Sequence, residues 1–125
     1  MFSITNTPEA PSAIGPYSQA VSCGNLLFTS GQVPLNPKTG EVVGEAITEQ
    51  AEMVMKNMAA ILSANGIGFE RVIKTTCFLA SMDDFSAFND VYAKYFTGKP
   101  ARSCVAVKTL PRNVLCEVEA ICILD

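Results

Sequence analysis

The chain contains no histidine, and this absence removes several common kinds of catalytic site. Imidazole is the base of Ser-His-Asp and Cys-His sites and supplies both histidine ligands of the HExxH metal motif. It is also the side chain whose ordinary pKa lies nearest to neutral pH. Any chemistry must therefore use carboxylates, arginine, lysine, tyrosine, cysteine, hydroxyls or backbone groups.

Charge is scarce as well. Charged residues make up 17% of the 125 residues and apolar residues 49%, and the net charge is -3. The nine basic residues are scattered, so no stripe of them can neutralise successive phosphates and no polybasic membrane patch exists. Nucleic-acid and membrane partners are therefore disfavoured. With so little polar coating, we expect another subunit to cover part of the apolar surface.

Targeting and cross-linking signals are lacking too. Residues 1–12 have neither a basic region nor an apolar stretch, so we expect no signal peptide, and no apolar run reaches membrane-spanning length. The cysteines are odd in number and form no CxxC pair, which argues against a disulfide framework and a zinc site. We therefore expect a cytoplasmic protein with reduced thiols and no bound metal. The five cysteines are Cys23, Cys77, Cys104, Cys116 and Cys122.

The sequence does contain a regular succession of strand-like and helix-like segments, and its length fits a single domain, residues 1–125. Apolar residues at helical spacing predict a helix over 47–64, and a second helix lies between Ser81 and the Lys99-Pro100 pair. β-branched and apolar runs predict strands over 18–23, 26–30, 72–80, 101–108 and 115–124.

This order predicts an α+β fold with a single mixed β-sheet and both helices packed on one face. The other sheet face then has no cover within the monomer, so it must be polar or meet another subunit. The last strand is wholly apolar on one face and mostly apolar on the other, which favours burial of both faces.

Arg102 is a charge inside a short apolar strand. If strands 101–108 and 115–124 form an antiparallel hairpin around Pro111, then Arg102, Cys104, Glu117 and Glu119 share one sheet face. Two interpretations stay open. Arg102 forms a structural ion pair with one of the glutamates, which spacing alone favours, or its guanidinium fork awaits a ligand carboxylate.

The two glutamates also have two interpretations. One of them neutralises Arg102 while the other holds water as a base, or both are exposed carboxylates. Cys104 is a candidate nucleophile near Arg102, but without histidine to activate it an inert buried thiol is favoured. By pattern alone, Asn89 belongs to the polar face of a helix and Tyr17 is a packing aromatic.

Several strings resemble the signatures of the RidA (YjgF-like) family, in the family's order and over nearly the whole chain. The most specific is residues 100–105 (PARSCV), followed by residues 117–121 (EVEAI); residues 15–20 (GPYSQA) and 29–34 (TSGQVP) match the N-terminal signatures. The resemblance implies a chorismate-mutase-like homotrimer, with the sheets in a barrel-like core, the helices outside, and active sites in clefts between subunits.

The resemblance also implies an activity: hydrolysis of 2-iminobutanoate and 2-iminopropanoate, or their enamine tautomers, to 2-oxo acids and ammonia, without a cofactor. The family's catalytic residues correspond to Arg102, which binds the substrate carboxylate, and Glu117, which holds water. Its other pocket residues correspond to Tyr17, Ser30, Gly31, Asn89 and Cys104, the last through its backbone amide.

The chain departs from the family at the pocket rim. The connection over 97–99 is short, and Lys99 stands where an aromatic residue commonly precedes Pro-Ala-Arg, so both bear on substrate size. The alternative function is a non-enzymatic regulatory trimer that binds a small metabolite in the same cleft; Glu117 favours the enzyme. The missing histidine and basic stripe argue against a ribonuclease, and a purely structural trimer or chaperone would need an internal partner for Arg102.

Overall fold

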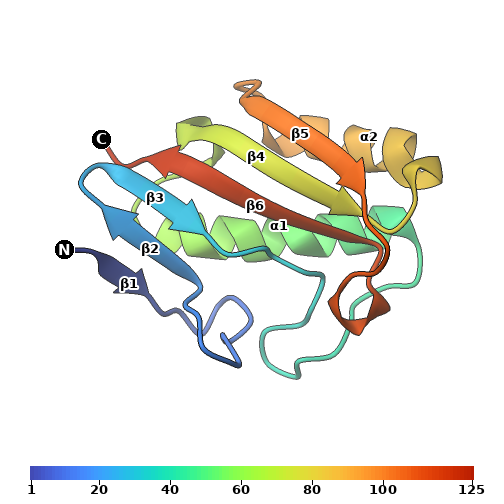
Figure 1. The fold of residues 1–125 in the computed structure, drawn as a ribbon, viewed down its shortest axis with the longest axis horizontal. Helices are drawn as coiled ribbons and strands as arrows, with labels where there is room; N and C mark the ends of the chain where they lie inside the picture. Colours follow the sequence, from blue (N-terminus) through green and yellow to red (C-terminus); the bar gives the residue numbers. More distant parts are fainter.

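A computed structural model describes residues 1–125 and contains one mixed sheet of six strands with two helices on one face (Figure 1). The predicted fold class is confirmed. No helix is long and apolar enough to cross a bilayer. The strands are β1 (Ser3–Thr5), β2 (Ala20–Cys23), β3 (Leu26–Thr29), β4 (Val72–Leu79), β5 (Ala101–Ala106) and β6 (Cys116–Ile123), and the helices are α1 (Ile47–Ala64) and α2 (Phe85–Tyr95).

Helix α1 has the predicted bounds, and its apolar stripe faces the sheet. At its start, the Glu49 carboxylate accepts hydrogen bonds from the backbone amides of Glu45 and Ala46, at 3.3 and 3.4 Å. At its end, the Asn65 side chain donates to the carbonyl of Ile61 at 2.9 Å, and Gly66 turns the chain at a φ of 73°. Because backbone groups at both ends of the helix have hydrogen-bond partners, the helix stays regular and presents one continuous apolar face to the core. That face consists of Ala51, Val54, Met55, Met58, Ile61 and Leu62, all fully buried.

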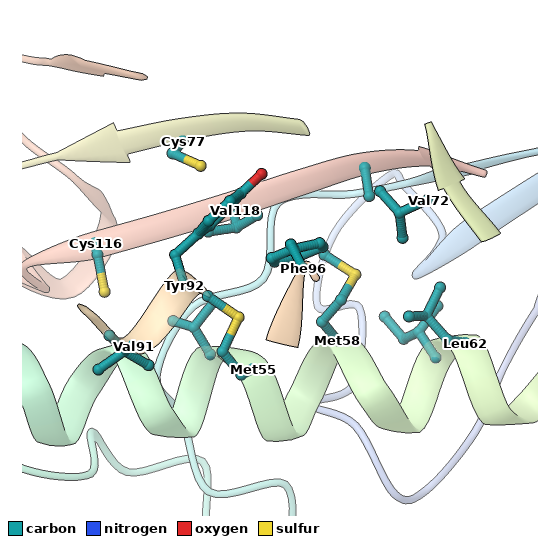
Figure 2. Packing of buried hydrophobic residues seen from close by; sticks show 14 of the residues in the cluster. Met55, Met58, Leu62, Val72, Cys77, Val91, Tyr92, Phe96, Cys116 and Val118 are labelled. Carbon is teal, nitrogen blue, oxygen red and sulfur yellow. The ribbon is translucent and has the colours of Figure 1, made fainter. Parts of the chain in front are cut away.

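The core lies between these helices and the central strands β4 and β6 (Figure 2). Three cysteines act there as small apolar side chains. Burial raises the pKa of Cys77 and Cys116 to about 12 and that of Cys122 to about 11. Since only the thiolate is a strong nucleophile, these three thiols are structural.

The sheet order, β1-β2-β3-β6-β4-β5, corrects one expectation. Strands β5 and β6 do not form a hairpin around Pro111. Instead β4 lies between them, parallel to β5 and antiparallel to β6. The physical reason is that α2 crosses the helix-covered face of the sheet and brings the chain back to the end where β4 starts. Strand β5 therefore begins at that same end and runs parallel to β4. Residues 107–115 then pass the end of β4, where the Val107 amide donates to the carbonyl of Leu79 and the Ala80 amide donates to the carbonyl of Leu115.

This pairing decides which side chains share a face. Cys77 lies opposite Cys104 on one side and opposite Val118 on the other, so these three point toward the helices. Arg102, two residues before Cys104, points the same way. Glu117 and Glu119, which flank Val118, point to the open face. The expectation that all four candidate residues share one face is therefore wrong for the two glutamates.

The open face carries exposed apolar side chains. Ile4 and Phe28 are 61% and 39% exposed, and Val105 is 46% exposed. Ile4, Val21 and Phe28 lie side by side across β1, β2 and β3. Both helices lie on the opposite face (Figure 1). An apolar sheet face of this kind is typical of a surface that another chain covers.

We predict that the chain assembles through this face as a trimer. Sedimentation equilibrium at micromolar concentration should give three times 13.3 kDa. Phe28→Glu should shift the protein to smaller species, because an unpaired charge is costly in an apolar interface. Lys56→Glu, on the exposed side of α1, is the matched control and should leave the mass unchanged. A wild-type monomer under these conditions would contradict the prediction.

Candidate functional site

Arg102 is held by helix α2. Its Nη1 donates a hydrogen bond of 2.7 Å to the side-chain carbonyl of Asn89. The guanidinium lies over the ring of Tyr92, 4.7 Å from its centroid, and 5.5 Å from that of Phe85. These three residues are spaced by four and three positions along α2, so they share one side of the helix. The hydrogen bond to the Asn89 side chain and the cation–π contacts with the two rings together fix the plane of the guanidinium.

The ring beneath Arg102 has its own support. The hydroxyls of Tyr92 and Thr75 share a hydrogen bond of 2.7 Å in the buried layer between sheet and helix. Thr75 lies directly opposite Arg102 in the β4–β5 pairing. Burial raises the pKa of Tyr92, which keeps its phenol neutral. Tyr92 therefore presents a neutral, positioned ring to the Arg102 cation.

Arg102 has no acidic partner within the chain. The single ion pair of the structure joins Lys94 of α2 to Glu52 of α1. The structural ion pair between Arg102 and either Glu117 or Glu119 is thus absent from the protomer. The guanidinium instead borders a pocket of about 520 Å³ that no acidic residue lines. The lining residues are Asn89, Tyr92, Ala93, Phe96, Thr97, Lys99, Pro100 and Arg102.

Glu117 lies on the other face of the sheet, against Gly31. A Cβ atom placed on Gly31 would overlap the Glu117 carboxyl group. Backbone hydrogen bonds between Gln32 and Val118, of 2.7 and 3.1 Å, hold this segment beside β6. Glu117 is half-buried, and burial, followed by the negative charge of Glu119, raises the pKa of its carboxyl. A raised pKa makes a carboxylate a better proton acceptor.

Ser30 and Tyr17 lie on the chain segments near Gly31. The Ser30 hydroxyl donates to the carbonyl of Ser18 at 2.6 Å, and the Ser30 amide donates to the carbonyl of Gln19 at 2.9 Å. Tyr17 is 55% exposed and borders a separate hollow of about 230 Å³. The predicted site residues thus fall into two groups. Arg102 and Asn89 lie on the helix side of the sheet. Glu117 points from β6 to the open face, beside Gly31, and Ser30 and Tyr17 lie on the neighbouring chain segments.

Cys104 shares the helix face with Arg102. Burial raises the pKa of its thiol, and the Arg102 guanidinium acts in the opposite direction. The net direction is upward, so the side chain is a thiol rather than a thiolate at neutral pH. This agrees with the interpretation of Cys104 as an unreactive side chain. No cluster of three or more cysteine, aspartate or glutamate side chains is placed to hold a metal ion.

Sequence reasoning missed the aromatic support of Arg102. The sequence pattern placed Asn89 on the polar face of the second helix, and Phe85 and Tyr92 lie four residues before it and three residues after it. The spacing of the three residues was the available signal. What the spacing could not tell was that Arg102 faces them, because this depends on the pairing of β5 with β4.

The comparisons with known proteins show the family of the chain. The sequence model of the family described as Endoribonuclease L-PSP matches residues 7–124. The chain belongs to this family. The resemblance to RidA proteins is confirmed by an Arabidopsis thaliana relative of the family, Reactive Intermediate Deaminase A, chloroplastic, which is 47% identical over 122 residues that cover 97% of this chain and 65% of the relative.

Other L-PSP relatives carry different names. A candidate regulator of Lactococcus lactis, AldR, is 54% identical over 119 residues and covers 94% of each chain. The crystal structure of Escherichia coli TdcF with bound serine has 42% sequence identity and a TM-score of 0.91, and it covers 97% of this chain and 98% of that one. The family and its fold are therefore shown, while its names span a deaminase, a regulator and an endoribonuclease.

We predict a direct coupling between Gly31 and Glu117. Gly31 has no left-handed φ, and the atoms nearest to a Cβ added there all belong to the Glu117 side chain. Such overpacking should destabilise the fold by about 1–3 kcal/mol. Adding Glu117→Ala should relieve the cost, which a double-mutant cycle of denaturant unfolding measures.

Gly98→Ala is the matched control, because a Cβ there meets nothing and no positive φ is involved. It should leave the free energy of unfolding unchanged. If Gly31→Ala cost the same with or without the Glu117 carboxyl, the placement of that carboxyl would be wrong.

Proposed function

We propose that the chain hydrolyses small 2-imino acids, such as 2-iminobutanoate and 2-iminopropanoate, or their enamine tautomers, to 2-oxo acids and ammonia. One observation carries the proposal: the Arg102 guanidinium is fixed on Asn89 and Tyr92 and borders a pocket with no acidic residue. The name of the Arabidopsis relative, a reactive intermediate deaminase, supports it.

Arg102 binds the substrate carboxylate. One guanidinium nitrogen is engaged by Asn89, and the remaining N–H donors of the fork match the two oxygens of a carboxylate. Every 2-imino acid presents that carboxylate next to its C=N bond. The TdcF structure holds serine, which is also an α-carboxylate with a nitrogen on the adjacent carbon.

The complete site requires two protomers in this proposal. Arg102 points toward the helices and Glu117 toward the open face, so one chain does not present both to one small substrate. Strand β5 is an edge strand, where a second chain has access. In a homotrimer of the chorismate-mutase-like kind, Arg102 of one protomer and the Glu117 carboxyl group of the next protomer would border the same cleft.

Glu117 is the base of the proposed reaction. It accepts a proton from water, the water oxygen bonds to the imine carbon, and the electron pair of the C=N bond moves to nitrogen. In the resulting carbinolamine, nitrogen takes up the proton that Glu117 accepted, and the C–N bond breaks as the hydroxyl oxygen forms the C=O bond and gives up its own proton. These changes release ammonia, leave the 2-oxo acid and return Glu117 to its carboxylate form. No metal or organic cofactor enters this scheme, because a protonated imine is already a strong electrophile.

A metabolite-binding regulator is the second candidate, because the relative AldR is named as a candidate regulator. Such a trimer would use the same cleft and keep Arg102, but it would need no base. The Endoribonuclease L-PSP description of the family has less support in this chain, since histidine is absent and the basic residues are scattered. We place the deaminase in the cytoplasm, where pyridoxal-phosphate enzymes such as threonine dehydratase release these imines.

Glu117→Gln separates the enzyme from the regulator. The amide keeps the shape but accepts no proton, so turnover coupled to threonine dehydratase should fall by roughly a hundredfold or more. The affinity of Glu117→Gln for 2-oxobutanoate, measured by calorimetry, should stay close to that of the wild type, because Arg102 binds the carboxylate. The wild-type rate should fall as the pH drops through the raised pKa of Glu117.

Glu119→Gln is the matched control on the same strand and face and should retain turnover. Unchanged turnover in Glu117→Gln would remove Glu117 as the base and favour the regulator.

A further inference from the structure

The pocket beside Arg102 contains a second cation that the proposed reaction does not use. Lys99 lines the same pocket, and no acidic residue does. The structure gives Lys99 no ion-pair partner, since the single salt bridge joins Lys94 and Glu52. Two unpaired cations at one pocket favour a ligand with two negative charges.

The backbone at Lys99 is tightly constrained. Helix α2 ends at Tyr95, and the Lys99 amide donates to the carbonyl of Phe96 at 3.2 Å. Lys99 has a φ of 53°, in the left-handed region that non-glycine residues seldom adopt. Pro100 follows, and its ring fixes its own φ. The short connection therefore sets where the lysine side chain starts, at the rim of the pocket.

The two cations lie within reach of one small ligand. Lys99 and Arg102 are three residues apart, so their Cα atoms are at most about 11 Å from each other. The pocket between them has a volume of about 520 Å³, within the range of pockets that hold much larger ligands than a four-carbon imine. Its apolar wall consists of Tyr92, Ala93, Phe96 and Pro100, which suits a short hydrocarbon chain between two charged ends.

We propose that Lys99 is a specificity-determining residue that selects 2-imino dicarboxylic acids, with 2-iminoglutarate as the representative substrate. Arg102 binds the carboxylate next to the imine, the methylene groups lie along the apolar wall, and Lys99 binds the distal carboxylate. This inference rests on the proposed function, because it assigns the reacting end of the substrate to Arg102.

The test compares two stable ligands that differ in one feature. 2-Oxoglutarate and 2-oxopentanoate have the same chain length, and only the first has a distal carboxylate. Calorimetry on the wild-type assembly should show tighter binding of 2-oxoglutarate by roughly fivefold, the scale of one exposed ion pair. Lys99→Met should bring the ratio of the two affinities to about one, while Lys56→Met, on the exposed side of α1, should keep it.

Turnover gives the second measurement. An amino-acid oxidase converts glutamate and norvaline to the matching imines, and hydrolysis is followed as 2-oxo acid formation. Lys99→Met should lower kcat/KM for the glutamate-derived imine relative to the norvaline-derived one, through KM rather than kcat. Raised salt should weaken the wild-type preference.

Each outcome is decisive. If the wild type bound both 2-oxo acids equally and Arg102→Ala abolished both, the role of Lys99 would be wrong, while carboxylate binding by Arg102 in the proposed function would stand. If neither ligand bound, or if binding ignored Arg102→Ala, both the proposed function and the role of Lys99 would fail. If Lys99→Met kept the preference for 2-oxoglutarate, another residue would bind the distal carboxylate and the role of Lys99 would be wrong.

Discussion

The parallel pairing of β5 with β4 determines where each candidate catalytic side chain points. It places Arg102 opposite Thr75 on the helix face and leaves Glu117 on the open face. An antiparallel hairpin of the last two strands would have allowed the arginine and the glutamate to neutralise each other. Because β4 separates the strands that carry them, both charges stay free for a ligand. The same pairing makes β5 an edge strand, where a second chain has access.

Helix α2 performs two tasks that depend on this arrangement. Phe88 and Val91 bury one side of the helix in the core, while Asn89 and Tyr92 hold the guanidinium. Lys94 and Tyr95 both donate to Glu52 of α1, which joins the two helices. The arginine is therefore oriented by a helix that is itself packed and linked, and a rigid support of this kind favours tight binding of a planar carboxylate.

The sequence predicts the helices and the fold class better than the site. The apolar spacing of α1 is local and strong, and its bounds over 47–64 are confirmed. The pairing of β5 is not local. The hydrophobic pattern of β6 is apolar on both faces, so it could not reveal that Glu117 and Arg102 point apart. Family strings identified both residues, yet only the pairing shows that one chain does not bring them together, and the support from Tyr92 follows from the same pairing.

The most direct test of this account is a subunit-mixing experiment with Arg102→Ala and Glu117→Gln. Each variant alone should be nearly inactive in the coupled deaminase assay. If the site joins Arg102 of one protomer to Glu117 of its neighbour, unfolding and refolding the variants together restores an intact pair at some interfaces. Random assembly at equal amounts should return about a quarter of the wild-type activity, whereas wild type mixed with the double variant controls for refolding. Refolded mixtures that remain as inactive as the separate variants would contradict a site shared between protomers.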